Sequence, residues 1–205
     1  MTREITKDDL AAAARVRPFC AVHFLIDGKT VVKTGENTRL AEANTMRFIR
    51  ENTNIPVPEV YDAYTHDETG HRHDQYFDDD IGGYGPYSTE EGFNQGLVRA
   101  WTKGREDDNF IRFLCKTLLH TMQGHEFVMT HNDFAPRNIL VRGSQVVAIL
   151  DWELSGYFPE YWEFAKALWR PAWDSPWMKD DLVERVLDPY YQQASLILNT
   201  SYTIW

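Results

Sequence analysis

The segment from His131 to Asp151 contains the residue types that phosphoryl transfer requires. Asp133 stands in a His-x-Asp sequence, Asn138 follows it after five positions, and Asp151 ends a later apolar run. In phosphoryl transfer, one carboxylate orients or deprotonates the attacking hydroxyl, while a side-chain amide and a second carboxylate hold Mg²⁺ on the nucleotide phosphates. Mg²⁺ prefers oxygen ligands and keeps water at its other positions. The residue types and their spacing therefore predict a magnesium-dependent phosphoryl-transfer site.

Two short β elements must bring these side chains together. Residues 127–130 predict a strand that leads into the His-x-Asp sequence, and residues 139–141 and 146–150 predict a hairpin. Because a hairpin reverses the chain, Asp151 is expected to return beside Asn138. In a different interpretation, the histidine and the asparagine cap turns and both aspartates are solvated. The agreement between the motif and its predicted context favours the catalytic interpretation.

The N-terminal part of the chain predicts two helices and a hairpin. One helix is expected up to about Arg17, and a second over Leu40–Arg50, in which Glu42 shares a face with apolar residues. Residues 21–26 and 30–33 are rich in β-forming side chains. The Asp-Gly pair between these two runs is a strong hairpin signal.

The C-terminal part predicts mostly helices. Ser88 is predicted to cap one helix, with Glu91 three residues later, and Asp108 to cap the next. Residues 161–169 and 179–198 predict two more helices. Strands with helices at the start, followed by helices around a short β-ribbon, indicate an α+β fold.

The composition limits the partners and the compartment that we expect. Lys and Arg number 21 and Asp and Glu number 31, which gives a net charge of −10. A negative surface repels nucleic-acid phosphates and mildly favours a cationic small substrate, although an acidic excess is more often a solvated surface. Cys20 and Cys115 fit no zinc-ligand spacing, the first residues are polar, and no apolar run reaches membrane-spanning length. We therefore expect a cytoplasmic protein with no membrane or nucleic-acid partner, and the oligomeric state stays open.

Several segments resemble the phosphotransferase enzyme family that includes aminoglycoside and choline kinases, and its fungal members most closely. The resemblance implies a protein-kinase-like bilobal fold, with a reduced N-terminal lobe and a mostly helical C-terminal lobe. It extends over roughly residues 28–66 and 84–178. The segments that carry it are 40–48, 54–61, 130–141, 148–153 and 156–168.

The same resemblance implies roles for the catalytic segment. ATP would donate its γ-phosphate to a small-molecule hydroxyl, with Mg²⁺ bound at the nucleotide. Asp133 is implied as the catalytic base, next to His131 in the catalytic loop. Asn138 and Asp151 are implied as the Mg²⁺ ligands. The family's usual loop has the sequence His-Gly-Asp, and Asn132 departs from it while leaving the two key side chains in place.

Four charged residues outside this segment have more than one interpretation. Lys33 ends a β-run, where a lone lysine is usually a surface residue. Glu42 lies on the next helix, and the pair resembles the lysine–glutamate ion pair that positions ATP in kinases. Glu160 and Glu163 could line the pocket of a cationic substrate, or could lie at an exposed helix start.

Two larger groups of residues also have more than one interpretation. An aromatic group could stack on a substrate amine or form core. Its members are Trp152, Tyr157, Tyr161, Trp162, Trp169 and Trp173. A second group hints at metal binding by composition, but its spacing fits no ligand pattern. It consists of His66, His71, His73, Asp74 and Asp78–Asp80.

The nucleotide pocket is predicted to be incomplete. No apolar strand follows residues 59–64, where a hinge would bind the adenine, and no Gly-rich phosphate loop is evident near residues 19–27. A catalytically impaired binding module and a structural fragment are therefore the alternatives to an active kinase. The predicted parts are a reduced N-terminal lobe (1–66), a polar junction (67–83) and a C-terminal catalytic lobe (84–205).

Overall fold

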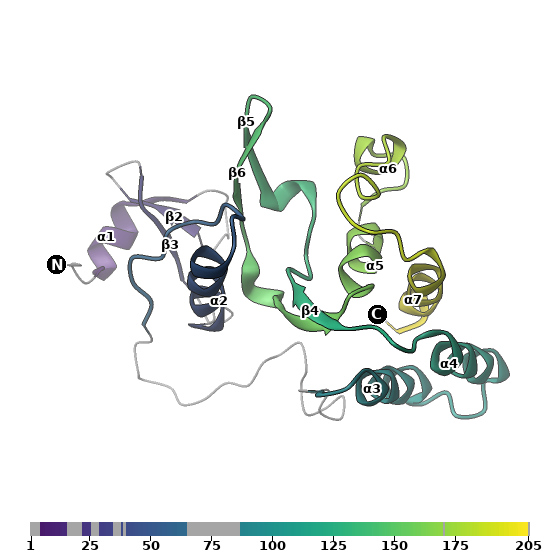
Figure 1. Ribbon diagram of the computed structural model, residues 1–205. Helices are drawn as coiled ribbons and strands as arrows, with labels where there is room; N and C mark the ends of the chain where they lie inside the picture. Colours follow the sequence, from purple (N-terminus) through teal and green to yellow (C-terminus); the bar gives the residue numbers. More distant parts are fainter. Residues whose placement is uncertain are drawn as a thin grey trace. The chain divides into compact units, whose positions relative to one another are not determined.

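The chain forms two compact units, each built from two separate stretches. Figure 1 labels the helices and strands and colours them in sequence order. The computed structural model describes residues 5–15, 22–25, 29–34, 38, 40–64, 87–169 and 171–204. The first unit takes residues 1–66 and 141–153, and the second takes 67–140 and 154–205. The predicted polar junction and the predicted Asp-Gly turn lie outside the described residues. The predicted lobe boundaries remain predictions.

The secondary structure is a mixture of helices and small sheets, as the predicted α+β class requires. The helices are α1 (Lys7–Ala12), α2 (Leu40–Asn52), α3 (Glu90–Thr102), α4 (Asn109–Thr121), α5 (Trp162–Trp169), α6 (Pro176–Lys179) and α7 (Tyr191–Ile204), with 3₁₀ turns η3 (Pro136–Asn138) and η4 (Trp152–Leu154). The strands are β1 (Ala14–Arg15), β2 (Val22–Phe24), β3 (Val31–Lys33), β4 (Phe127–Thr130), β5 (Ile139–Arg142), β6 (Gln145–Ile149) and β7 (Gly156–Pro159).

The first unit contains an antiparallel sheet in the order β1-β2-β3. The pairing of β2 with β3 confirms the predicted hairpin, and α2 confirms the predicted second helix. The prediction of one helix up to Arg17 is wrong, because α1 ends at Ala12. Ala13 has an extended backbone, and β1 then pairs with β2, with Ala14 opposite Phe24. Hydrogen bonding to a neighbouring strand replaces the helical hydrogen bonds that the alanine run would otherwise make.

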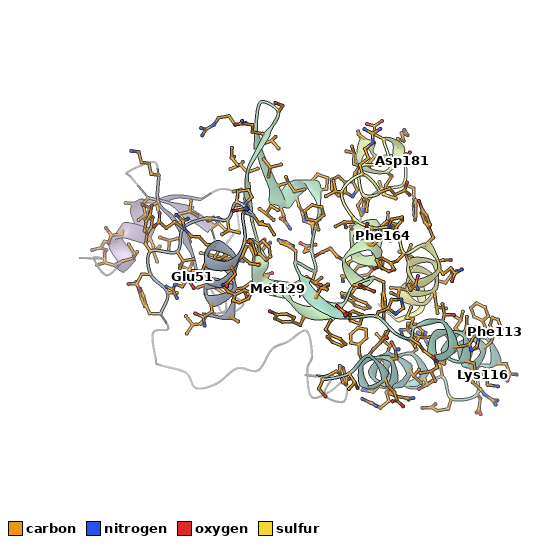
Figure 2. The ribbon with its side chains drawn as sticks, viewed as in Figure 1. Glu51, Phe113, Lys116, Met129, Phe164 and Asp181 are labelled. Atoms are coloured by element: carbon orange, nitrogen blue, oxygen red, sulfur yellow. The ribbon has the colours of Figure 1, made fainter. Side chains whose placement is uncertain are left out.

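Helix packing forms the core of the second unit. Helices α3, α4, α5 and α7 pack on one another. The buried residues Ile111, Leu114 and Leu118 recur at helical spacing on α4 and face this core. Figure 2 shows Phe113 and Lys116 projecting from the other side of α4, and Phe113 is 62% exposed. The α4 helix is therefore amphipathic, with one face committed to the core.

Two helix starts in this unit test the predicted caps. Asp108 caps α4 as predicted, since its carboxylate accepts the backbone N–H groups of Phe110 and Ile111 at 2.8 and 3.2 Å. The cap predicted at Ser88 is wrong by one residue. Thr89 is the N-cap of α3, and its hydroxyl accepts the N–H of Gly92 at 3.1 Å.

The helix predicted over residues 179–198 is also wrong, because the structure divides it. Helix α6 ends at Lys179, turns follow, and α7 begins only at Tyr191. Two features lie in this interruption. Asp181, shortly after α6, has a left-handed backbone with φ of +52°. Pro189, shortly before α7, has no N–H to donate and disfavours helical backbone at the residue before it.

The predicted strand β4 is confirmed, and its partner is β7. The two strands pair antiparallel from Phe127 opposite Pro159 to Thr130 opposite Gly156. The ring of Phe93 on α3 makes edge-to-face contacts with both strands, at 6.3 Å from Phe127 and 6.2 Å from Phe158. These contacts fix the strand that leads directly into the segment beginning at His131. No helix among the described residues has both the length and the apolar character needed to cross a membrane.

Candidate active site

Strand β4 leads into the loop that begins at His131, and the start of this loop is buried. Thr130 and His131 are 1% and 4% exposed. The imidazole of His131 accepts the backbone N–H of Asp133 through Nδ1, at 3.2 Å. The ring of His131 also meets Phe134 edge to face. In this geometry His131 shapes the loop that presents Asp133.

Glu163 on α5 holds the same loop from the other side. Its carboxylate accepts the N–H of His131 at 2.5 Å and the N–H of Asn132 at 3.1 Å. Burial raises the pKa of Glu163 to about 7, in opposition to hydrogen bonds from the N–H groups of His131, Asn132 and Phe134. The interpretation of Glu163 as an exposed helix-start acid is therefore wrong, because the side chain is committed to these backbone groups.

Asp133 and Asn138 are in direct contact. The side-chain amide of Asn138 donates to the carboxylate and to the carbonyl oxygen of Asp133, both at 2.9 Å. Arg137 forms an ion pair with the other carboxylate oxygen of Asp133. Since the NH₂ group of Asn138 is used in these bonds, its Oδ1 is the atom that can bind a cation.

The first unit contains a second cluster of charged groups, around Lys33 at the end of β3. The ammonium of Lys33 contacts Glu42 at 2.9 Å, Asp151 at 2.8 Å and Glu153 at 2.9 Å. Oxygen atoms from the three acids lie within 4.8 Å of one another. Such an all-oxygen set suits a hard cation. In the structure the ammonium of Lys33 supplies the positive charge at its centre.

The electrostatics of this cluster hold Lys33 charged. Burial disfavours the ammonium, but hydrogen bonds to Asp151, Glu153 and Glu42 outweigh it and raise the pKa of Lys33 above its ordinary value. Burial raises the pKa of Glu42, and its ion pair with Lys33 opposes that change. The lysine is therefore a fixed positive charge across the physiological pH range.

The predicted contact between Lys33 and Glu42 is present, and Asp151 joins it. In the second unit, Asp133, Asn138 and His131 lie together. The prediction that Asp151 lies beside Asp133 and Asn138 stays a prediction. The roles of all these residues are likewise proposals.

Three residues of these two clusters were not predicted from the sequence or were misinterpreted: Glu153, Arg137 and Glu163. Glu153 carried a usable signal, because it is an acid two residues after Asp151. Arg137 carried one too, because it lies between Asp133 and Asn138. The contact of Glu163 had no local signal, since its partner His131 lies 32 residues away.

Most of the aromatic group has structural contacts. Trp152 is 4% exposed and donates its indole N–H to the carbonyl of Ile149, and Tyr161 is fully buried. Trp162 stacks on Phe158 with ring centres 5.8 Å apart. Trp173 is 60% exposed. The His- and Asp-rich group between residues 66 and 80 lies outside the described part of the chain.

The loop after β4 in the second unit and the charged cluster around Lys33 in the first unit each contain residue types that phosphoryl transfer uses. The chain matches the model of the phosphotransferase enzyme family over residues 88–196, which is more than half of its 205 residues. The protein therefore belongs to the phosphotransferase enzyme family. No curated protein and no solved structure gives a significant match.

Proposed function

We propose that the protein transfers the γ-phosphate of ATP to a hydroxyl group of a small molecule, with Mg²⁺ bound at the nucleotide. The observation that carries this proposal is the direct contact of Asp133 with Asn138, held at the end of β4 in a phosphotransferase family member. The reaction needs a carboxylate that accepts the proton of the acceptor hydroxyl and, beside it, an amide that binds the metal.

Each side chain has one role in this proposal. Asp133 accepts the proton of the attacking hydroxyl, and the imidazole of His131 holds the loop that presents it. Lys33 contacts the nucleotide phosphates, and Glu42 orients it. Asn138 and Asp151 would hold Mg²⁺, which when bound would neutralise charge on the phosphates.

The proposed architecture is the kinase-like bilobal fold, with the nucleotide lysine in a reduced N-terminal lobe. Lys33 follows a three-stranded sheet and pairs with Glu42 on the next helix. We propose a cytoplasmic enzyme with no nucleic-acid or membrane partner. The net charge of −10 supports an acceptor of neutral or cationic character.

The test separates binding from transfer. Asp151→Asn should weaken Mg²⁺-dependent ATP binding by about tenfold or more, because it removes one charge from the metal site. Asp133→Asn should bind ATP like the wild type and lose transfer to any hydroxyl acceptor. Calorimetry of Mg·ATP binding and consumption of ATP with a panel of hydroxyl acceptors measure the two effects. Asp107→Asn makes the same chemical change at an exposed position between α3 and α4 and is the matched control. Equal loss of ATP binding in both aspartate variants would contradict this division of roles.

A second candidate is a binding module that holds a ligand without turnover. The specific observation is that both carboxylate oxygens of Asp133 are already engaged, one by Arg137 and the other by Asn138. In addition, the described residues 53–64 contain no strand that could serve as a hinge. Binding of Mg·ATP with no ATP consumption in the presence of any acceptor would establish this second candidate.

A further inference from the structure

We propose that Asn132 is a positioning residue, which fixes the orientation of Asp133 by linking the catalytic loop to α5 and to the end of η4. The proposal rests on the proposed function for its kinetic consequence. Its structural content concerns only the second unit and can be measured without any turnover.

The first observation is the backbone of Asn132. Its φ is +68°, in the left-handed region. Among residues with a side chain, asparagine and aspartate tolerate this conformation best, and glycine adopts it without strain. The reversed backbone lets the two consecutive N–H groups of His131 and Asn132 point at the single carboxylate of Glu163. Backbone conformation alone therefore permits Gly, Asn or Asp at this position.

The second observation is the side-chain amide, which uses both of its ends. The indole N–H of Trp162 donates to Oδ1 of Asn132 at 2.9 Å. The NH₂ group of Asn132 donates to the carbonyl of Leu154 at 3.0 Å. An indole can only donate and a carbonyl can only accept, so the two partners fix which end of the amide faces which way. Only asparagine supplies both a donor and an acceptor here with the required backbone.

The third observation is that the anchor is itself held. The indole of Trp162 lies parallel to the ring of Phe158, with 8° between the planes and 5.8 Å between the centres. Its edge-to-face contact with Phe93 has a centre distance of 5.0 Å. Offset stacking and edge-to-face contacts are the favourable aromatic arrangements. The side chain of Asn132 is thus hydrogen-bonded to an indole that two aromatic rings hold in place.

Asp133 directly follows Asn132 in the chain. A rotation of the Asn132 backbone therefore moves the carboxylate of Asp133. A displacement of a reacting group by about 1 Å can cost on the order of a hundredfold in rate. Asn132 touches neither the acceptor nor the metal in this account. Its contribution is to hold the residue that does.

Two variants remove the link while keeping the backbone and the packing. Asn132→Gly keeps the left-handed conformation and removes both side-chain hydrogen bonds. Trp162→Phe keeps an aromatic ring between Phe93 and Phe158 and removes the indole donor. Asn54→Gly makes the same chemical change at an exposed loop position and is the matched control.

The first readout needs no substrate. The indole ¹⁵N–¹H resonance of Trp162, assigned by its loss in the Trp162→Phe variant, should move in Asn132→Gly and stay in place in Asn54→Gly. Amide hydrogen exchange at Asp133 should accelerate by about tenfold in Asn132→Gly, because the loop loses two of its anchors. An unmoved indole resonance, or unchanged exchange at Asp133, would overturn the proposal even if the wild type transfers no phosphate.

The second readout is kinetic. Asn132→Gly and Trp162→Phe should each lower kcat by about tenfold to a hundredfold, with Mg·ATP affinity unchanged. The double variant should be no slower than the slower single variant, since both break the same link. A wild-type kcat in Asn132→Gly would overturn the positioning role. A wild type with no transfer at all counts against the proposed function, and the indole and exchange measurements then decide on the link alone.

Discussion

The carboxylate of Glu163 should make stability depend on pH in a direction opposite to that of an ordinary salt-bridged acid. Burial raises its pKa to about 7 from an ordinary 4.5. Because the pKa is higher in the folded protein than in the unfolded chain, folding favours the protonated acid. This contribution is complete below about pH 4.5 and is lost as pH rises towards about 7.

The magnitude follows from the difference between the two pKa values. One pKa unit corresponds to about 1.4 kcal/mol, so the difference between about 7 and 4.5 corresponds to about 3 kcal/mol. The Glu163→Gln variant has no proton to exchange and lacks this dependence. The unfolding free energy of the wild type, relative to Glu163→Gln, should therefore fall by about 3 kcal/mol between pH 4.5 and 7.5.

Urea unfolding at four pH values across that range measures the effect, and titration of the other acids cancels in the comparison. Glu91→Gln makes the same chemical change at an exposed position of α3 and is the matched control. A difference between wild type and Glu163→Gln that is constant, or that grows with pH, would refute the reasoning. It would mean that the N–H groups of His131 and Asn132 stabilise the ionised carboxylate more than burial disfavours it.

Three further predictions concern other parts of the two units. Lys33→Met should weaken ATP binding by about tenfold, measured by calorimetry, because within the described part of the chain no other ammonium pairs with Glu42; wild-type affinity would remove Lys33 from the nucleotide site. Asp108→Ala should lower the unfolding free energy by about 1 kcal/mol in urea titration, because two N–H groups of α4 lose their acceptor; no change would mean that water replaces the cap. Leu118→Ala should cost about 3 kcal/mol because the side chain is fully buried, whereas Phe113→Ala on the exposed face should cost less than about 1 kcal/mol; similar costs would contradict the assignment of the α4 faces.

The elements that the sequence predicted correctly have strong local signals. Asp108 precedes an apolar helical pattern, and β4 is a short apolar run before the catalytic motif. The errors came from tertiary pairing and from one overlooked residue. Pairing of Ala14 with Phe24 ended α1 early, although the alanine run favours helix. Pro189 was present in the sequence and argued against a continuous helix through residues 188–189, whereas the left-handed backbone of Asp181 had no comparable signal.

In the candidate site, too, local patterns were predicted correctly and a contact that depends on tertiary packing was not. Asp133 and Asn138 were found because their spacing is fixed along the chain. The pair of Lys33 and Glu42 was found because strand and helix follow each other closely. The contact between Glu163 and His131 depends on how α5 packs against the end of β4, and no local pattern encodes that packing.

The order in which the ribosome releases the chain has a consequence for the cluster around Lys33. Lys33 and its partner Glu153 are 120 residues apart in sequence. At about 5–20 residues per second, roughly 6–24 s separate the synthesis of the two. The N–H of Ile149 donates to the carbonyl oxygen of Pro56, and this hydrogen bond also cannot form before residue 149 is synthesised. Throughout that interval the nascent first unit lacks its second stretch, so a fragment ended near residue 66 would carry the lysine without two of its three carboxylates.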